Sequence, residues 1–396
     1  MSHESVKSPV LGAALWECRR ELAVSFKSDL LTGLLIALLS LPFALGLALA
    51  AGVPAVHGLY TMIVAGTLVA LLGGSRFQIT GPTAAFAVIL APITAELGLP
   101  GLLAAGFLGG VLLIVFALLG IGSWIERIPA SVSVGFTTGI AVVIAKLQLQ
   151  TLGHLGTSDW INALACFGAL LALPRVKSLR SIPPAFLALV VSVILPASQR
   201  IEIPPGMPEP QWLSGLHWST LPVLILPALS IALLASLESL LAAQVSDLDT
   251  GLKHSSRSEL LALGIGNCLA PLFGGIPAAG AIARTTANWR LGARTPLSGV
   301  FHGLWALSFL WALAPWVSRV PVAGLSGILL WVAWKMADPA RFWRLLQSST
   351  RAHQAALMTA LSLTIAANMI VGVIAALAVL GVIGRIRSKN GWLDWD

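Results

Sequence analysis

Two charged residues that lie in apolar stretches suggest the chemistry of this sequence. Arg284 lies in GGIPAAGAIARTTANWRLGAR at 274–294, where glycine and proline loosen or break a helix. Glu238 lies in the apolar run SIALLASLESLLAAQ at 230–244. A guanidinium fork suits a carboxylate or a sulfate, and a carboxylate in apolar surroundings can take up and release a proton. Together they suggest an anion-binding site with a proton-binding group beside it.

The composition indicates that both residues lie in a membrane. Of 396 residues, 57% are hydrophobic and 10% are charged, against about 25% charged in an average soluble domain. The apolar segments are about 20 residues long, which fits spanning helices rather than the shorter alternating segments of a β-barrel. A charge at membrane depth is costly and marks a functional site by default.

The remaining composition argues against other classes of protein. The net charge of +8 comes from basic residues spread along short loops, which fits the positive-inside pattern of membrane proteins rather than nucleic-acid binding. The three cysteines, Cys18, Cys166 and Cys268, are odd in number and far apart, so they indicate neither a disulfide framework nor a metal site. No signal peptide is recognisable up to Ser28.

The spans fall into two similar halves of seven elements each. The third element is broken in both halves, at Gly81 in the first and near Arg284 in the second, 203 residues later. An odd number of elements per repeat requires opposite orientations of the halves in the bilayer, a plan in which paired interrupted spans mark the substrate site. We therefore predict an all-α integral membrane protein with 14 transmembrane elements in a 7+7 inverted repeat, each broken span being a short strand plus a half-helix.

The charges predict the orientation of this arrangement. With the N-terminus inside, 20 of the 24 basic residues fall in inner segments, which leaves Arg200 and Arg319 outside and Lys146 and Arg284 within spans. This bias predicts that both termini are cytoplasmic. The predicted parts are an N-terminal segment at 1–28, a first repeat at 29–197, an extracellular linker at 198–220, a second repeat at 221–386 and a cytoplasmic tail at 387–396.

The two breaks together predict the anion site. Irregular backbone survives at membrane depth only where it is buried in protein or lines a polar cavity. Half-helices that start at Gly81 to Thr83 and at Ala283 to Thr285 would direct free N–H groups and positive dipole ends into that cavity. Glu238 at about 6 Å from Arg284 would attract it by roughly 2 to 3 kcal/mol, so that anion binding and protonation would influence each other. The alternatives are that Arg284 extends to an interface, or that the two residues form a purely structural ion pair.

Three stretches carry a resemblance to a known family. They are LPFALGLALAAGVPAVHGLY at 41–60, GGSRFQITGPTA at 73–84, and the segment between 236 and 296 that contains SLESLLAAQVSD and GGIPAAGAIARTTANWRLGARTP. In this order and spacing they resemble the SulP anion transporters, which include sulfate permeases, bicarbonate transporters, prestin and pendrin. The resemblance implies a core domain and a gate domain that move against each other, with the anion between the third and tenth elements.

The resemblance also implies roles for individual residues. Glu238 falls at the acidic position of the eighth span that is associated with coupling. The residues of the two breaks that fall at the anion site are Gly81, Pro82, Thr83, Ala283 and Arg284. Thr285 is added to the predicted site because it lies in the start of the second half-helix.

The sequence departs from the family pattern at several positions. Phe43 and Leu47 stand where members often have glutamine and an aromatic residue, so the wall of the site is expected to be rearranged. Ala242 replaces the threonine of sodium-coupled members, which favours protons over sodium. Ala283 stands where many members have serine, which removes one hydroxyl donor. No STAS domain follows Ile386 in this sequence.

We expect a secondary active transporter of small anions, of the dicarboxylate, sulfate or bicarbonate class, that works as a proton-coupled symporter by alternating access. The alternatives are a nucleobase–proton symporter of the same fold, against which Arg284 argues, and an anion channel or prestin-like motor. No nucleophile–base pair or metal cluster supports an enzyme, and no cofactor is expected. The expected partners are the anion, a proton and the lipid bilayer, in a bacterial inner membrane, without nucleic acid. A homodimer is left open.

Overall fold

The structure of the chain is a computed structural model that describes residues 11–125, 128–179, 182–204, 206, 210, 219–367 and 369–389. Parts of the predicted N-terminal segment, extracellular linker and cytoplasmic tail therefore lie outside the described residues.

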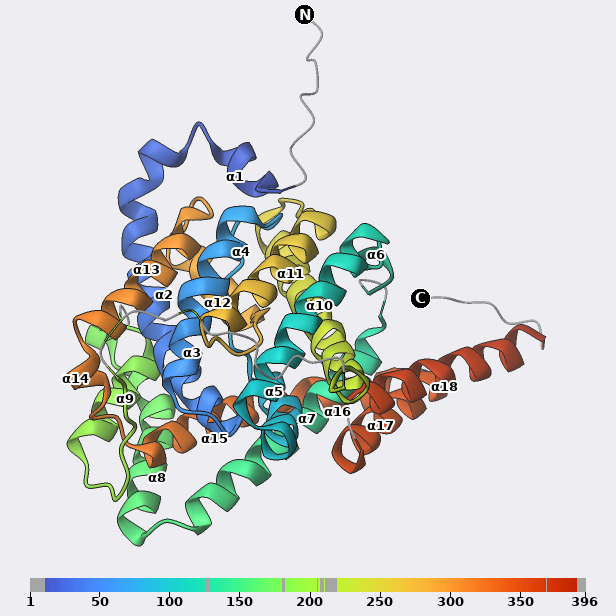
Figure 1. Ribbon diagram of the computed structural model, residues 1–396. Coiled ribbons are helices and arrows are strands. Elements are labelled where there is room, and N and C mark those ends of the chain that lie inside the picture. The colour runs from blue at the N-terminus through green and yellow to red at the C-terminus, as the bar shows by residue number, and fades with distance from the viewer. Residues whose placement is uncertain are drawn as a thin grey trace, which may run out of the picture.

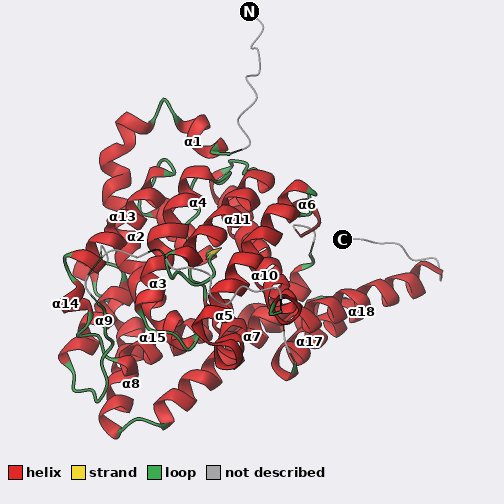
Figure 2. Cartoon of the chain, viewed as in Figure 1, coloured by secondary structure: helices red, strands yellow, loops and turns green. Residues whose placement is uncertain are grey.

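The described chain is almost entirely helical, as Figures 1 and 2 show. This confirms the predicted all-α class. The first part contains α1 (Ala13–Cys18), α2 (Leu22–Ala50), α3 (Val56–Thr61), the π-helix η1 (Met62–Gly66), α4 (Thr67–Leu72), β1 (Thr80–Gly81), α5 (Ala84–Leu118), α6 (Gly122–Ile125), α7 (Ala130–Gly153), α8 (Thr157–Ala172), the 3-10 turns η2 (Leu173–Arg175) and η3 (Lys177–Leu179), and α9 (Pro184–Ile194). The second part contains α10 (Leu221–Thr250), α11 (Ser256–Leu272), β2 (Ala279–Gly280), α12 (Ile282–Arg290), α13 (Leu297–Trp311), α14 (Ala314–Val317), α15 (Val322–Ala337), α16 (Pro339–Ser348), α17 (Arg351–Ala366) and α18 (Met369–Lys389).

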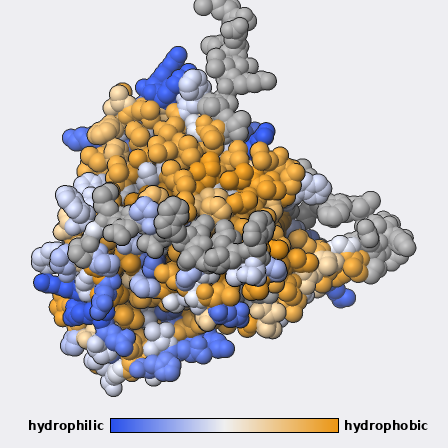
Figure 3. Space-filling model, in the orientation of Figure 1, coloured by the Kyte–Doolittle hydropathy of each residue, from blue (hydrophilic) through white to orange (hydrophobic). Residues whose placement is uncertain are grey.

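Helix lengths and surface chemistry fit a membrane protein. By length and composition, α2, α5, α7 and α10 are each able to cross a bilayer. Large apolar side chains are also exposed on many helices, among them Trp124 at 73% and Leu248 at 86%. Figure 3 shows that apolar residues cover much of the visible face. A soluble monomer rarely exposes so much contiguous apolar surface.

The break in α5 separates two of the predicted spans. Gly98 has φ 67° and ψ −174°, so the helix is interrupted there by a backbone conformation that glycine adopts without steric cost. Pro100 follows, and it fits the first turn of the next helical segment. The residues before Gly98 form the half-helix of the third predicted element, and those after it form the fourth.

The two broken elements meet at the centre of the molecule. β1 and β2 pair antiparallel, with Thr80 opposite Gly280 and Gly81 opposite Ala279. This short pair is the yellow segment in Figure 2. The predicted strand-plus-half-helix form of both breaks is therefore present. Residues about 200 positions apart in the sequence form a single feature.

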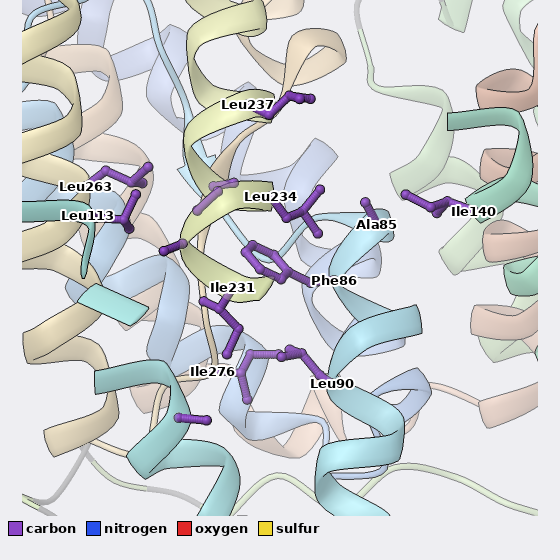
Figure 4. Packing of buried hydrophobic residues seen from close by; sticks show 14 of the residues in the cluster. Ala85, Phe86, Leu90, Leu113, Ile140, Ile231, Leu234, Leu237, Leu263 and Ile276 are labelled. Carbon is purple, nitrogen blue, oxygen red and sulfur yellow. The ribbon is translucent and has the colours of Figure 1, made fainter. Parts of the chain in front are cut away.

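The largest hydrophobic cluster holds the strand pair between helices. It joins residues of α5, α7, α10 and α11 with the segment that leads into β2. Figure 4 shows Phe86 and Leu90 of α5 packed toward Ile231 of α10 and toward Ile276. Because Phe86 and Ile231 are at most 1% exposed, the helix that starts at the first break is fixed firmly against α10.

Candidate functional site

The start of α5 lies beside the carboxylate of α10. Thr83 precedes the helix in an extended conformation, with φ −117° and ψ 155°, and α5 begins at Ala84. The Thr83 hydroxyl does not cap its own helix; it donates to Glu238 Oε2 at 2.5 Å. Phe86 N–H donates to Thr83 O at 3.1 Å. In general the N–H groups of a first helical turn lack helical acceptors, and this property suits helix starts to anions.

The start of α12 is held in place by the strand pair. α12 begins at Ile282 after the extended residue Ala281, whose N–H donates to Ile79 O at 3.2 Å. Gly280 N–H donates to Ser239 Oγ at 2.8 Å, which ties β2 to the residue next to Glu238. Both helix starts are thus anchored to the same turn of α10.

Arg284 joins the two breaks directly. Its side chain comes from α12 and is 3% exposed, and Nη2 donates to the carbonyl oxygen of Pro82 at 2.8 Å. Within the described residues, Nη1 has no hydrogen-bond partner. A Cβ on Gly81 would lie 2.7 Å from Nη1, so the guanidinium occupies the space that the missing side chain leaves. Arg284 therefore does not extend to an interface, and that alternative is wrong.

Glu238 lies near Arg284 without contacting it. In the described chain no ion pair within 4.0 Å joins the two side chains, although the arginine charge acts on the carboxylate. Glu238 is partly exposed, whereas Arg284 is buried. The structure therefore does not show a direct ion pair between Glu238 and Arg284. The guanidinium is buried, and the carboxylate, which accepts the Thr83 hydroxyl, lies near it without a direct bond.

The structure separates the other predicted site residues into two sets. Phe43 and Leu47 of α2 belong to one small apolar cluster with Ala84 and Ala87 of the first turn of α5 and with Leu329 of α15, so they form an apolar wall beside the helix start. Thr285 instead faces away from any open space. It is fully buried, and its hydroxyl accepts from Ile79 N–H at 3.2 Å.

Ala283 lies on the open side of α12, next to Arg284. It is exposed, as is the preceding residue, Ile282. Of the residues predicted at the second break, Ala283 is thus exposed, Arg284 is buried, and Thr285 is buried and bonds the strand segment at Ile79.

Sequence reasoning missed a buried carboxylate that holds the first break. Glu259 on α11 is fully buried and accepts from the N–H groups of Gly74 and Ser75 at 2.9 and 3.0 Å and from Gln78 Nε2 at 2.7 Å. The second break has a counterpart in Asn267, which bonds both backbone groups of Ala278. The sequence signal for Glu259 was an acidic residue in the first turn of a helix, which commonly has only a local role.

Comparison with known proteins identifies the family. The model of the sulfate permease family matches residues 26–201 and 153–361. The chain belongs to the sulfate permease family. Among its relatives, YvdB of Bacillus subtilis, whose name proposes sulfate as its substrate, is 38% identical over 380 residues, covering 88% of this chain and 71% of its own length. The bicarbonate transporter BicA of Picosynechococcus is 30% identical over 416 residues, covering 92% of this chain and 71% of its own length.

Two solved structures have the same fold as this chain. The transmembrane domain of a cyanobacterial bicarbonate transporter BicA matches with a TM-score of 0.81 and 26% identity over 88% of this chain and 97% of that domain. Murine SLC26A9 matches with a TM-score of 0.82 over 98% of this chain at 17% identity, which shows the fold alone. The predicted family is confirmed. The chain is a multi-pass anion transporter of the membrane, and the prediction that it is not an enzyme is also confirmed.

Proposed function

We propose that this chain is a proton-coupled symporter of a small anion of the dicarboxylate, sulfate or bicarbonate class. The observation that carries the proposal is the position of Arg284, which is buried where two helix starts meet and bonded to the carbonyl of Pro82. An unneutralised guanidinium in a membrane interior is costly, and a bound anion removes that cost. The names of the relatives favour sulfate and bicarbonate among the three classes.

The anion would bind on the accessible side of the strand pair. Backbone N–H groups at the starts of α5 and α12 would donate to it, and the charge of Arg284 would act from behind Gly81. Because Ala283 offers no hydroxyl, the contacts would come mainly from the backbone. Phe43 and Leu47 would exclude water from one flank, which strengthens the electrostatic attraction.

Glu238 would couple the anion to a proton through Thr83. When ionised, the carboxylate accepts the Thr83 hydroxyl at 2.5 Å and opposes a dianion beside it. When protonated, it no longer repels the anion, and its O–H can donate to Thr83. The Thr83 hydroxyl is then free to donate to the anion. Proton and anion would therefore be bound together, and each would raise the affinity for the other.

Alternating access would move the anion site relative to the apolar wall. The proposed repeats at 29–197 and 221–386 would each supply seven elements, with both termini cytoplasmic in a bacterial inner membrane. Leu47 of α2 and Leu329 of α15 pack together beside the start of α5. Contacts of this kind, apolar and without hydrogen bonds, can separate and reform as a gate moves against a core.

Uptake into proteoliposomes tests the proposal. Radiolabelled sulfate, bicarbonate, oxalate and C4-dicarboxylates would be compared with and without an inward proton gradient. Accumulation of one of them against its own gradient is expected. Passive equilibration alone would favour a channel or motor, and proton-driven accumulation of a nucleobase would favour the nucleobase symporter.

Two variants separate binding from coupling. Arg284→Ala should weaken anion binding, and wild-type affinity in that variant would contradict the proposed site. Glu238→Gln should bind the anion but lose its response to a pH gradient, and an unchanged response would remove Glu238 from the coupling step. Glu96→Ala, which removes an exposed carboxylate from α5, is the matched control.

A further inference from the structure

A short helix between α15 and α17 has no part in the proposed transport cycle. α15 and α17 both pack against α7, which is long and apolar enough to cross a bilayer. α16 joins the end of α15 to the start of α17, and none of its residues is buried. Its ten residues span roughly 15 Å, about half the thickness of a bilayer core. A helix of this length between two neighbouring apolar helices lies along the membrane surface rather than across the membrane.

Contacts at both ends fix the direction of α16. Asp338 caps the end of α15 and the start of α16, and it is the one non-glycine residue of the described chain with a positive φ, at 34°. Its carboxylate accepts from Arg341 N–H at 3.2 Å. At the other end, the side-chain amide of Gln354 on α17 donates to Leu346 O at 2.7 Å and to Ser349 O at 3.1 Å. α16 therefore presents a fixed face to its surroundings.

The side chains of α16 divide between an apolar side and a basic side. At 100° per residue, Phe342, Leu345 and Leu346 lie within one sector of the helix, and all three are partly buried. This sector is the side on which α16 packs against α7 and α17. Arg341 and Arg344 lie outside it, one turn apart, and both are exposed. The helix is therefore amphipathic, with two neighbouring guanidinium groups directed away from the protein.

A tryptophan is exposed beside these arginines. Trp343 is 57% exposed, and its ring meets the ring of Phe342 edge-on, with the ring centres 6.3 Å apart. A large aromatic side chain gains little from exposure to water, but it suits the headgroup region of a membrane, where tryptophan is enriched. Basic residues on one face with tryptophan, phenylalanine and leucine beside them are typical of helices that lie in a membrane surface.

The arginines of α16 have no acidic partner among the described residues. The ion pairs of the described chain join other residues, and the nearest acid, Asp338, already caps the helix. From residue 322 to residue 389 the sequence has seven basic residues and one acidic residue. Unpaired guanidinium groups have the donor geometry that suits phosphate. The charge of this surface is thus complementary to anionic headgroups.

We propose that α16 is a binding surface for anionic phospholipids, with Arg341 and Arg344 on the headgroup phosphates and Trp343 between the headgroups beside them. The position of the helix at the membrane surface and the exposed indole favour a lipid over a soluble anion. Bound lipid would hold the end of α15 at the membrane surface. The same helix carries Leu329, which belongs to the apolar wall beside the start of α5.

Lipid titration of the purified protein in detergent tests the proposal, with the thermal unfolding midpoint as the measurement. Phosphatidylglycerol should raise the midpoint of the wild type more than phosphatidylcholine with the same acyl chains. Each arginine should contribute about fivefold to the affinity, so the double variant Arg341→Ala, Arg344→Ala should need roughly thirtyfold more phosphatidylglycerol for the same rise. The double variant Arg341→Lys, Arg344→Lys keeps both charges and should stay within about threefold of wild type. The matched control is Lys253→Ala, Arg257→Ala, which removes two exposed basic residues at the turn into α11.

Several results of this titration would overturn the proposal. Equal stabilisation of the wild type by both lipids would show that the headgroup charge is not recognised. An unchanged response to phosphatidylglycerol in the double alanine variant of α16 would remove its arginines from the surface, and an equal loss in the control would indicate a general charge effect. Stabilisation by inorganic phosphate that is lost in the same α16 variant would assign the surface to soluble anions instead.

Fluorescence quenching gives an independent measurement of where α16 lies. The sequence has 14 tryptophans, so the difference in fluorescence between the wild type and Trp343→Phe isolates this one. In proteoliposomes that contain phosphatidylglycerol, this difference should be quenched by phospholipids brominated near the headgroup end of the acyl chain, and only weakly by iodide in the buffer. Strong quenching by iodide without quenching by the brominated lipids would place α16 away from the membrane and refute the lipid-binding surface.

Discussion

Replacing Glu259 by alanine should loosen the segment that leads into the first break. The carboxylate accepts two backbone N–H groups, from Gly74 and Ser75, and the side-chain amide of Gln78. It is fully buried, so in the alanine variant these three donors would have neither a protein acceptor nor bulk water. The backbone from residue 73 to 79 would then have to shift, and the start of α5 with it.

The structure gives the size of the effect. A hydrogen bond to a charged group contributes about 1.5 to 3 kcal/mol, and removing one partner of a buried charged cluster costs about 3 to 5 kcal/mol. We expect Glu259→Ala to lower the free energy of unfolding by about 3 to 5 kcal/mol. Glu259→Gln should lose about 1 to 2 kcal/mol, because charge-assisted bonds are roughly twice as strong as neutral ones. Once the Gln78 amide has turned over, the new amide can donate to Gln78 Oε1, which has no partner among the described residues.

Thermal unfolding in detergent, followed by tryptophan fluorescence, would measure these losses. The expected order of midpoints is wild type, then Glu259→Gln, then Glu259→Ala well below both. Glu96→Ala, at an exposed carboxylate on α5, should stay within about 0.5 kcal/mol of wild type. Equal midpoints for the alanine and glutamine variants would mean that the lost charge, and not the unpaired donors, causes the loss of stability, which would refute this prediction. Anion affinity should fall in the same order.

Two other substitutions test the packing around the site. Gly81→Ala would place a Cβ 2.7 Å from Arg284 Nη1. Anion titration should then show binding weakened by about tenfold or more, with secondary structure unchanged by circular dichroism. Unchanged affinity would mean that the guanidinium can move aside. Asp29→Ala removes the acceptor of Arg294 N–H at 2.7 Å and of the Thr295 hydroxyl at 2.6 Å. Thermal unfolding should show a loss of about 3 kcal/mol in the free energy of unfolding. A loss below about 1 kcal/mol would indicate that the linker between α12 and α13 finds other acceptors.

The sequence was sufficient to predict both breaks and the arginine between them. Small residues and proline in an apolar stretch have few structural explanations. The sequence GPT at 81–83 and the segment around Arg284 therefore indicate breaks even when their contacts are unknown. The family, the helical class and the anion-transport function followed from the same residues and are confirmed. The roles of Glu238 and of the individual site residues stay predictions.

Residues whose importance depends on distant partners were not predictable. In the sequence Glu259 is an ordinary acidic residue in a first helical turn, and its acceptor role depends on Gly74 and Ser75, which lie 185 and 184 positions away. Thr285 was predicted at the site because it lies in the start of the second half-helix, but its hydroxyl accepts from Ile79 N–H instead.

The pairing of β1 with β2 also has a consequence for biogenesis. Thr80 pairs with Gly280, which is synthesised 200 residues later. At about 5 to 20 residues per second, roughly 10 to 40 s pass between the two during translation. Throughout that interval the first break would enter the bilayer with backbone groups that lipid cannot satisfy. The nascent chain must therefore keep its first half near water or the insertion machinery until the second arrives. Substitutions in either strand should reduce the yield of inserted protein even where they spare the affinity of the molecules that mature.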